Sequence, residues 1–85
     1  MQLPAEEMRP VINRLKRAQG QLTAVIRMLE EDGECKDVVT QLSAVSKALD
    51  RAGFVIIAEG MQKCLENPDE ALDKKQLEKL FLSLA

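Results

Sequence analysis

The sequence predicts an all-α fold of three helices. Two long stretches, residues 8–29 and 35–56, place apolar side chains at alternating steps of three and four, the spacing of a heptad seam on one side of a helix. Each stretch is followed by a segment that favours termination of a helix, at residues 30–34 and 66–68. No stretch shows the strict alternation of apolar and polar residues that is typical of a strand.

The first helix is predicted to begin around Pro10, because proline is well tolerated in the first turn of a helix. It is predicted to end in the segment EEDG, where Gly33 would supply a left-handed stop. Gly20, in mid-helix, costs about 1 kcal/mol relative to alanine, and we attribute it to close approach of another helix, with a local bend as the alternative. The seam residues are Met8, Val11, Leu15, Ala18, Leu22, Val25 and Leu29.

The second helix is predicted to run from Cys35 to the segment ENP, over about 30 residues or about 45 Å. Its seam residues are Cys35, Val38, Leu42, Val45, Leu49, Ala52 and Ile56. Pro68 ends this helix and disfavours helical geometry at Asn67, which can then cap a third helix with Glu70 as the carboxylate of its first turn. One side of the third helix carries Leu72, Leu77, Leu80, Phe81 and Leu84.

A chain of 85 residues forms a single domain, residues 1–85, with a small core. A middle helix of the predicted length is longer than such a core needs, and its apolar run FVIIA extends the surface that must be covered. A second copy of the chain is the simplest partner that could bury this apolar surface, so we expect an obligate homo-oligomer.

The composition also limits the cellular compartment and the classes of function that we expect. No apolar run approaches the roughly 20 residues of a membrane span, and the first residues lack the layout of a secretion signal, so we expect a cytoplasmic protein without a membrane partner. No nucleophile–base pair, phosphate loop or acid–base dyad is evident, so we expect no enzyme. The net charge is −2, yet residues 8–29 hold five basic and no acidic side chains, which fits either a local nucleic-acid footprint or a solvated helix face.

Two cysteines, Cys35 and Cys64, stand at opposite ends of the predicted middle helix. They would be about 43 Å apart on nearly the same face, too far for a disulfide or a shared metal within one chain. If two copies of the helix pair antiparallel about an axis near Leu49 and Asp50, Cys35 of one chain meets Cys64 of the partner subunit. The alternative from spacing alone is two unrelated buried thiols. We expect Cys35 to be the better nucleophile, because a helix N-terminus stabilises negative charge.

The run NRLKRAQGQLTAVIRMLEEDGECKDVVTQLSAVSKAL, residues 13–49, resembles the CsoR/RcnR/FrmR family of bacterial repressors. The later segments DRAGF and CLENP extend the resemblance over nearly the whole chain. It implies three-helix protomers that form antiparallel dimers and then tetramers as dimers of dimers. It also implies binding to double-stranded operator DNA without a helix-turn-helix, and release of that DNA when the cysteine site is occupied.

The copper sensors of that family carry cysteine, histidine and cysteine at the positions of Cys35, Gly60 and Cys64, and this chain contains no histidine. A tyrosine and a glutamate that support copper binding in those sensors align with Glu34 and Leu80. Nickel and cobalt sensing in the family require several histidines, so the resemblance does not extend to those sensors.

Formaldehyde sensing in the family uses a proline where this chain has Gln2. The resemblance is thus closest to the persulfide-sensing branch, CstR. It implies that small reactive sulfur species modify Cys35, and that Cys64 of the partner subunit then attacks to form a di- or polysulfide bridge. No cofactor is expected in that case. The alternative inducer is Cu(I), which accepts two thiolates in linear coordination and would use the same two cysteines as metal ligands.

Arg14, Arg17 and Gln21 share a helix face beside the seam. By resemblance, Arg14, Arg17 and Arg51 match basic positions used for operator binding. Lys16 and Arg9 are adjacent candidates, and Gln21 is either a further DNA contact or a solvated polar residue. Phosphate neutralisation with release of counterions would then drive DNA binding. Two rivals of other classes remain open, a helical module that binds a protein partner and a thiol carrier of sulfur or copper.

Overall fold

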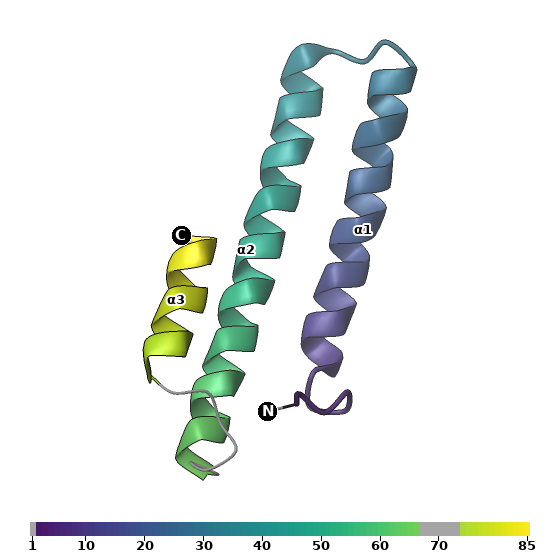
Figure 1. The fold of residues 1–85 in the computed structure, drawn as a ribbon. Coiled ribbons are helices and arrows are strands. Elements are labelled where there is room, and N and C mark those ends of the chain that lie inside the picture. The colour runs from purple at the N-terminus through teal and green to yellow at the C-terminus, as the bar shows by residue number, and fades with distance from the viewer. Residues whose placement is uncertain (1, 67–73) are drawn as a thin grey trace.

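The structure, a computed structural model, describes residues 2–66 and 74–85. Over these residues it contains three helices and no strand: α1 (Arg9–Glu30), α2 (Cys35–Glu66) and α3 (Lys74–Leu84) (Figure 1). The all-α prediction is confirmed, and so are the expected extents of the first two helices. No helix in this part of the chain is long and apolar enough to cross a membrane.

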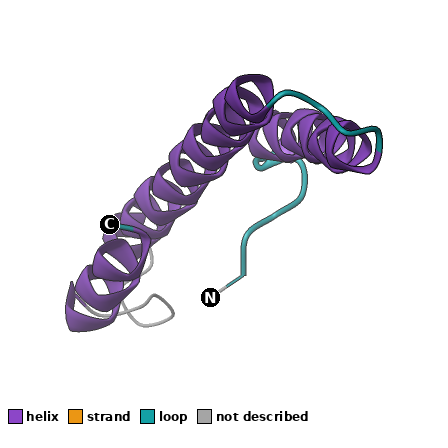
Figure 2. Cartoon of the chain, turned by 90° about the horizontal axis from the view of Figure 1, so that it is seen from above, coloured by secondary structure: helices purple, strands orange, loops and turns teal. Residues whose placement is uncertain are grey.

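The helices are arranged around α2. α1 and α2 form an antiparallel hairpin, and α3 returns along the C-terminal half of α2 (Figure 1). Seen along the hairpin, α1 and α3 lie against different sides of α2, which contacts both of them (Figure 2). The molecule is long and thin, with extents of 53, 26 and 13 Å. A shape this thin leaves much of α2 without cover from its own chain.

The core between α1 and α2 uses every seventh residue of the two predicted seams. The buried positions are Val11, Ala18 and Val25 in α1 and Val38, Val45 and Ala52 in α2. Among the intervening seam residues, Met8 is buried and Leu15 and Ile56 pack against the core, whereas Leu22, Leu42 and Leu49 are 41%, 48% and 46% exposed. One half of each seam therefore holds the hairpin together, and part of the other half forms an apolar surface at Leu22, Leu42 and Leu49.

The turn between α1 and α2 corrects the prediction of a left-handed glycine at Gly33. The residue with positive φ is Asp32, at 59°, and no glycine in the described part of the chain has a positive φ. Gly33 is needed for another reason, the lack of space for a side chain where its N–H donates to the Met28 carbonyl oxygen at 2.7 Å and closes the last turn of α1. A Cβ at Gly33 would lie 2.8 Å from that same oxygen.

The expectation that Gly20 permits close approach of another helix is wrong within the chain, because a Cβ at this position would meet nothing within 4 Å.

Alanine substitutions at Gly33 and Gly20 are therefore expected to change the free energy of unfolding in opposite directions. Gly33→Ala is expected to lower the free energy of unfolding by about 1–3 kcal/mol, because the backbone around Met28 must shift. Gly20→Ala is expected to raise it by up to about 1 kcal/mol, because alanine favours the helix. Urea unfolding of both variants checks this, and equal effects would contradict it.

α3 packs on the second half of α2 through small and aromatic side chains. A Cβ on Gly53 would lie 2.6 Å from Cδ1 of Leu84, so glycine allows the C-terminal end of α3 to approach α2. Phe54 and Phe81 form a tilted pair with ring centroids 5.3 Å apart. On the predicted apolar side, Leu77 and Leu84 are partly buried, whereas Leu80 and Phe81 are 46% and 47% exposed. The predicted start of this helix, Asn67, Pro68, Glu70 and Leu72, lies outside the described residues.

Candidate functional site

Cys35 is the first residue of α2, and its thiol is free and exposed. It follows the acidic turn at the end of the hairpin that is remote from α3 (Figure 1). The position at the N-terminus of the helix agrees with the prediction. A soluble electrophile or a soft metal ion can reach this sulfur without any rearrangement of the chain.

Cys64 lies in the last turns of the same unbroken helix. The helical rise separates its α-carbon from that of Cys35 by about 43 Å, which excludes a bridge within one chain. The structure thus confirms the separation on which the two-subunit hypothesis rests. The placement of the Cys64 side chain lies outside the description, and the pairing with a partner subunit stays a prediction. The described residues contain no group of three or more His, Cys, Asp or Glu able to hold a metal ion.

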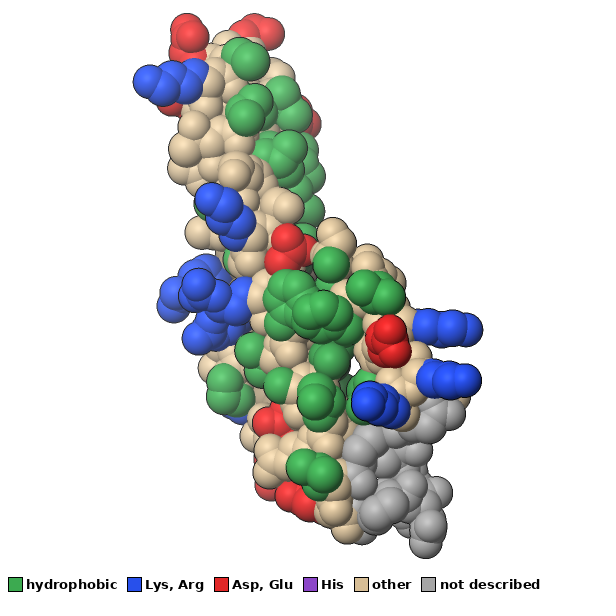
Figure 3. Space-filling view, turned by 90° about the vertical axis from the view of Figure 1, so that its left-hand side faces the viewer, with side chains coloured by type: hydrophobic (Ala, Val, Ile, Leu, Met, Phe, Trp, Pro, Cys, Tyr) green, Lys and Arg blue, Asp and Glu red, His purple; other side chains and the backbone are tan. Residues whose placement is uncertain are grey.

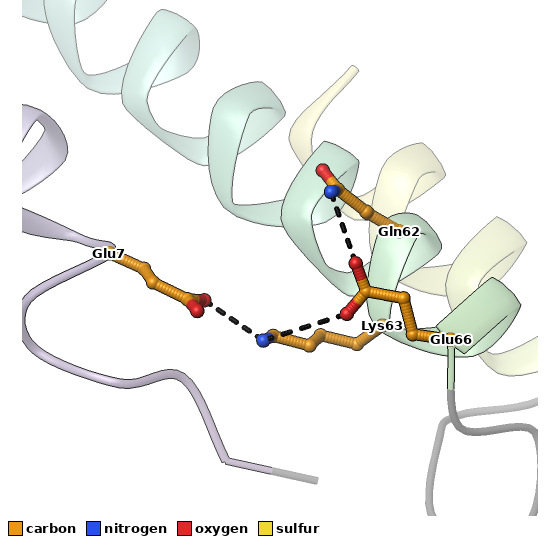
Figure 4. A network of polar contacts seen from close by, with 4 residues as sticks. All are labelled: Glu7, Gln62, Lys63 and Glu66. Atoms are coloured by element: carbon orange, nitrogen blue, oxygen red, sulfur yellow. Dashed lines mark hydrogen bonds and ion pairs between the residues drawn. The ribbon is translucent and has the colours of Figure 1, made fainter.

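The segment before α1 contacts the C-terminal part of α2 through an ion pair and apolar packing. Met8 is 7% exposed and packs against Ala52. The Lys63 ammonium lies 2.9 Å from a Glu7 carboxylate oxygen and 3.9 Å from Glu66, which also accepts a hydrogen bond from Gln62 (Figure 4). The hydrogen bond with Glu7 raises the pKa of Lys63 above its usual value, so the contribution of this contact to the free energy of unfolding is fully present at neutral pH and is lost as the pH rises through the raised pKa.

A basic groove lies between α1 and α2, with a volume of about 630 Å³. Among the predicted DNA-binding residues, Arg14, Arg17 and Gln21 line it from α1, and Arg51 lines it from α2. Lys16 and Arg9, the remaining candidates, do not line it. The other lining residues, which sequence reasoning did not select, are Asn13, Ala18, Ala44, Lys47 and Ala48.

The groove arises from helical periodicity on two facing helices. The spacing of Asn13, Arg14, Arg17 and Gln21 places them on one face of α1, and steps of three and four place Ala44, Lys47, Ala48 and Arg51 on one face of α2. Alanines leave space between the long basic side chains. Lys47 could have been found from the sequence as the residue one turn before Arg51, once the facing register of the helices was known.

No carboxylate lines the groove, and no ion pair within the described part of the chain neutralises its four cations, Arg14, Arg17, Lys47 and Arg51. Figure 3 shows Lys and Arg side chains gathered at mid-height on one edge of the molecule, beside exposed hydrophobic side chains. Four like charges around one hollow repel one another, so this arrangement favours a polyanionic ligand.

The fold and these two features define a class of protein: a helical hairpin that combines a basic groove with an exposed thiol far from it. Comparison with known families places the chain within that class. Residues 7–84 match the family of metal-sensitive transcriptional repressors, and the chain belongs to this family. Its members are transcriptional repressors, not enzymes.

Several relatives are copper-sensing transcriptional repressors by name. The chain is 46% identical over 59 residues to CsoR of Mycobacterium ulcerans, which covers 69% of this chain and 50% of that protein. It is 42% identical over 52 residues to RicR of Mycobacterium tuberculosis, covering 61% and 54%, and 29% identical over 72 residues to CsoR of Bacillus subtilis, covering 85% and 71%. The chain spans about half the length of the mycobacterial relatives that it matches.

Proposed function

We propose that this protein is a cytoplasmic repressor that binds double-stranded operator DNA through the basic groove and is released when the Cys35 and Cys64 thiols are occupied. The single observation that carries DNA binding is the groove, with four uncompensated cations on the facing sides of α1 and α2. Membership of a repressor family supports the same conclusion.

The proposal includes an antiparallel dimer, with tetramers formed as dimers of dimers. The chain exposes 6776 Å² of surface, whereas a compact monomer of its mass exposes roughly 5,000 Å². The exposed surface includes large apolar side chains, among them Leu22, Leu42 and Leu49 on the outward part of the two seams. A two-fold axis near Leu49 would cover this surface and bring Cys35 to Cys64 of the partner subunit.

We propose Cu(I) as the inducer that the comparisons support best, because the relatives are named as copper sensors. Two thiolates suit this soft ion, which accepts linear coordination. The sequence comparison with the CstR branch favoured reactive sulfur, and none of these relatives carries that name. Cu(I) held by Cys35 and by Cys64 of the partner subunit would link the ends of two α2 helices.

Reactive sulfur species are the second candidate, and Gly60 is the observation that favours them. Gly60 is buried in α2 and offers no third ligand. The Cys35 thiolate would take the outer sulfur of a low-molecular-weight persulfide and release its thiol. Cys64 of the partner subunit would then attack the sulfur bonded to the Cys35 Cβ, forming a disulfide and releasing hydrogen sulfide. The two cysteines are oxidised and the sulfane sulfur is reduced, so no further oxidant is needed.

The test uses the reduced protein and a duplex that carries the promoter region beside its own gene. Fluorescence anisotropy measures DNA affinity before and after addition of one equivalent of Cu(I) per thiol pair or of a persulfide donor. Intact-mass spectrometry measures the adduct. Release by Cu(I) without sulfur adducts supports the copper proposal, and release by the donor with cross-linked dimers supports the sulfur candidate. Failure of the apo-protein to bind DNA at all would overturn both, in favour of a protein-interaction module or a thiol carrier.

A further inference from the structure

We infer that Lys47 is a phosphate-contacting residue of the DNA interface, and that the DNA backbone enters the groove between α1 and α2. The inference deepens the proposed function and rests on it. It assigns Lys47 a role that the sequence comparison did not give it, and it ranks Lys47 above Lys16, which the sequence did suggest.

The position of Lys47 carries the first step. Its side chain lines the groove opposite Arg14 and Arg17 of α1, one helical turn from Arg51. Lys47 also lines the neighbouring hollow on α2 with Asp50 and Phe54, so it lies on the ridge between the two concave surfaces. Asp50 is an acidic group near Lys47, but it lies on that neighbouring side and is absent from the groove lining.

The second argument for a phosphate contact is the charge of Lys47. It is an exposed lysine without an ion-pair partner in the described part of the chain, in contrast to Lys63, which is paired with Glu7. An unpaired lysine beside three arginines raises the local positive potential, and a phosphate is the group that relieves this repulsion. Lysine binds phosphate as a point charge, so the contact carries no base sequence information.

The shape of the groove carries the third step. Ala18, Ala44 and Ala48 leave it hollow between the basic side chains, which can then surround a phosphate from both helices. Lys16 is exposed on α1 but does not line the groove, so it can contribute only long-range attraction. The two lysines have the same charge and differ in place, which makes them a matched pair.

The expected result follows from counterion release. Lys47→Gln should weaken DNA binding about eightfold at 0.1 M salt for each copy in contact, and lower the slope of log affinity against log salt by about 0.9 per copy. The loss should be the same for promoter and unrelated duplexes, and Lys47→Arg should restore it. Lys16→Gln, and Lys79→Gln on α3 as a remote control, should change the slope by much less. Titration calorimetry or anisotropy at four salt concentrations measures these values.

Ala44→Leu tests entry into the groove without a change of charge. Ala44 is exposed, so leucine there is expected to leave folding intact while it fills part of the hollow. Loss of affinity supports entry of the backbone, whereas unchanged affinity would overturn that part of the inference. If wild-type protein binds the duplex but Lys47→Gln behaves as Lys79→Gln does, the assignment of Lys47 fails and the repressor proposal stands. Equal affinity for single-stranded RNA would also overturn the inference.

Discussion

Replacing Arg17 and Arg51 together by glutamine is expected to weaken operator binding about 60-fold at 0.1 M salt for each chain in contact with DNA. The reason is that both guanidinium groups line the groove, from α1 and α2 respectively, and each releases counterions when it contacts a phosphate. Anisotropy titrations over a range of salt concentrations measure the loss, and the slope against salt should fall by about 1.8 for each such chain.

The matched control is the double substitution of Arg9 and Arg27, which are exposed at the two ends of α1 and lie outside the groove. It removes the same charge from the chain and should cost far less affinity, because only long-range attraction is lost. If the two double variants weaken binding equally, net charge rather than the groove governs the interaction. Circular dichroism should show unchanged melting for the groove variant, since both its arginines are exposed.

Substituting either cysteine by serine is expected to abolish release of the operator by the inducer while leaving DNA affinity without inducer unchanged. Cys35 is exposed and far from the groove, so its replacement removes no DNA contact. The stronger result is expected from mixed oligomers. In an antiparallel dimer of one Cys35→Ser chain and one Cys64→Ser chain, one of the two sites keeps both thiols and the other has none. Mixing the two inactive variants should therefore restore part of the response.

Refolding the two variants together, with each variant refolded alone as the control, makes this complementation measurable by anisotropy with Cu(I) and with the persulfide donor. A response in the mixed sample alone places each functional pair across a subunit boundary. No response in the mixture, with both variants inactive alone, would show that the thiols do not work as pairs of one Cys35 with one Cys64 in an antiparallel dimer.

The helices were predictable because their periodicity is strong and local. Apolar steps of three and four mark α1 along its length and α2 as far as Ile56, and Pro10 marks the start of α1 to within a residue or two. The turn was less predictable. Asp32 takes the left-handed conformation that was predicted for Gly33, and Gly33 lies where the backbone passes close to the Met28 carbonyl. A sequence pattern shows that a glycine is needed at a position. It does not show whether the position requires a positive φ or the absence of a Cβ.

The site was only partly predictable, because it depends on how two helices face each other. Arg14, Arg17 and Arg51 were selected by resemblance, and the structure brings them together. Lys47 lines the groove and Lys16 does not, because these positions follow from the register of α2 against α1, which no single-helix pattern encodes. Likewise, the seam did not reveal that Leu42 and Leu49 face away from α1, because a heptad marks an apolar side without naming its partner.

The thinness of the protomer has a consequence for the cell that carries it. If a second copy covers this apolar surface, as proposed above, the concentration of the active species depends on a power of the protein concentration rather than on that concentration itself. Halving the protein concentration through weak translation would then lower the occupancy of an unsaturated promoter more than twofold. A promoter under this control would respond sharply to dosage of its own regulator, even in medium that contains no inducer.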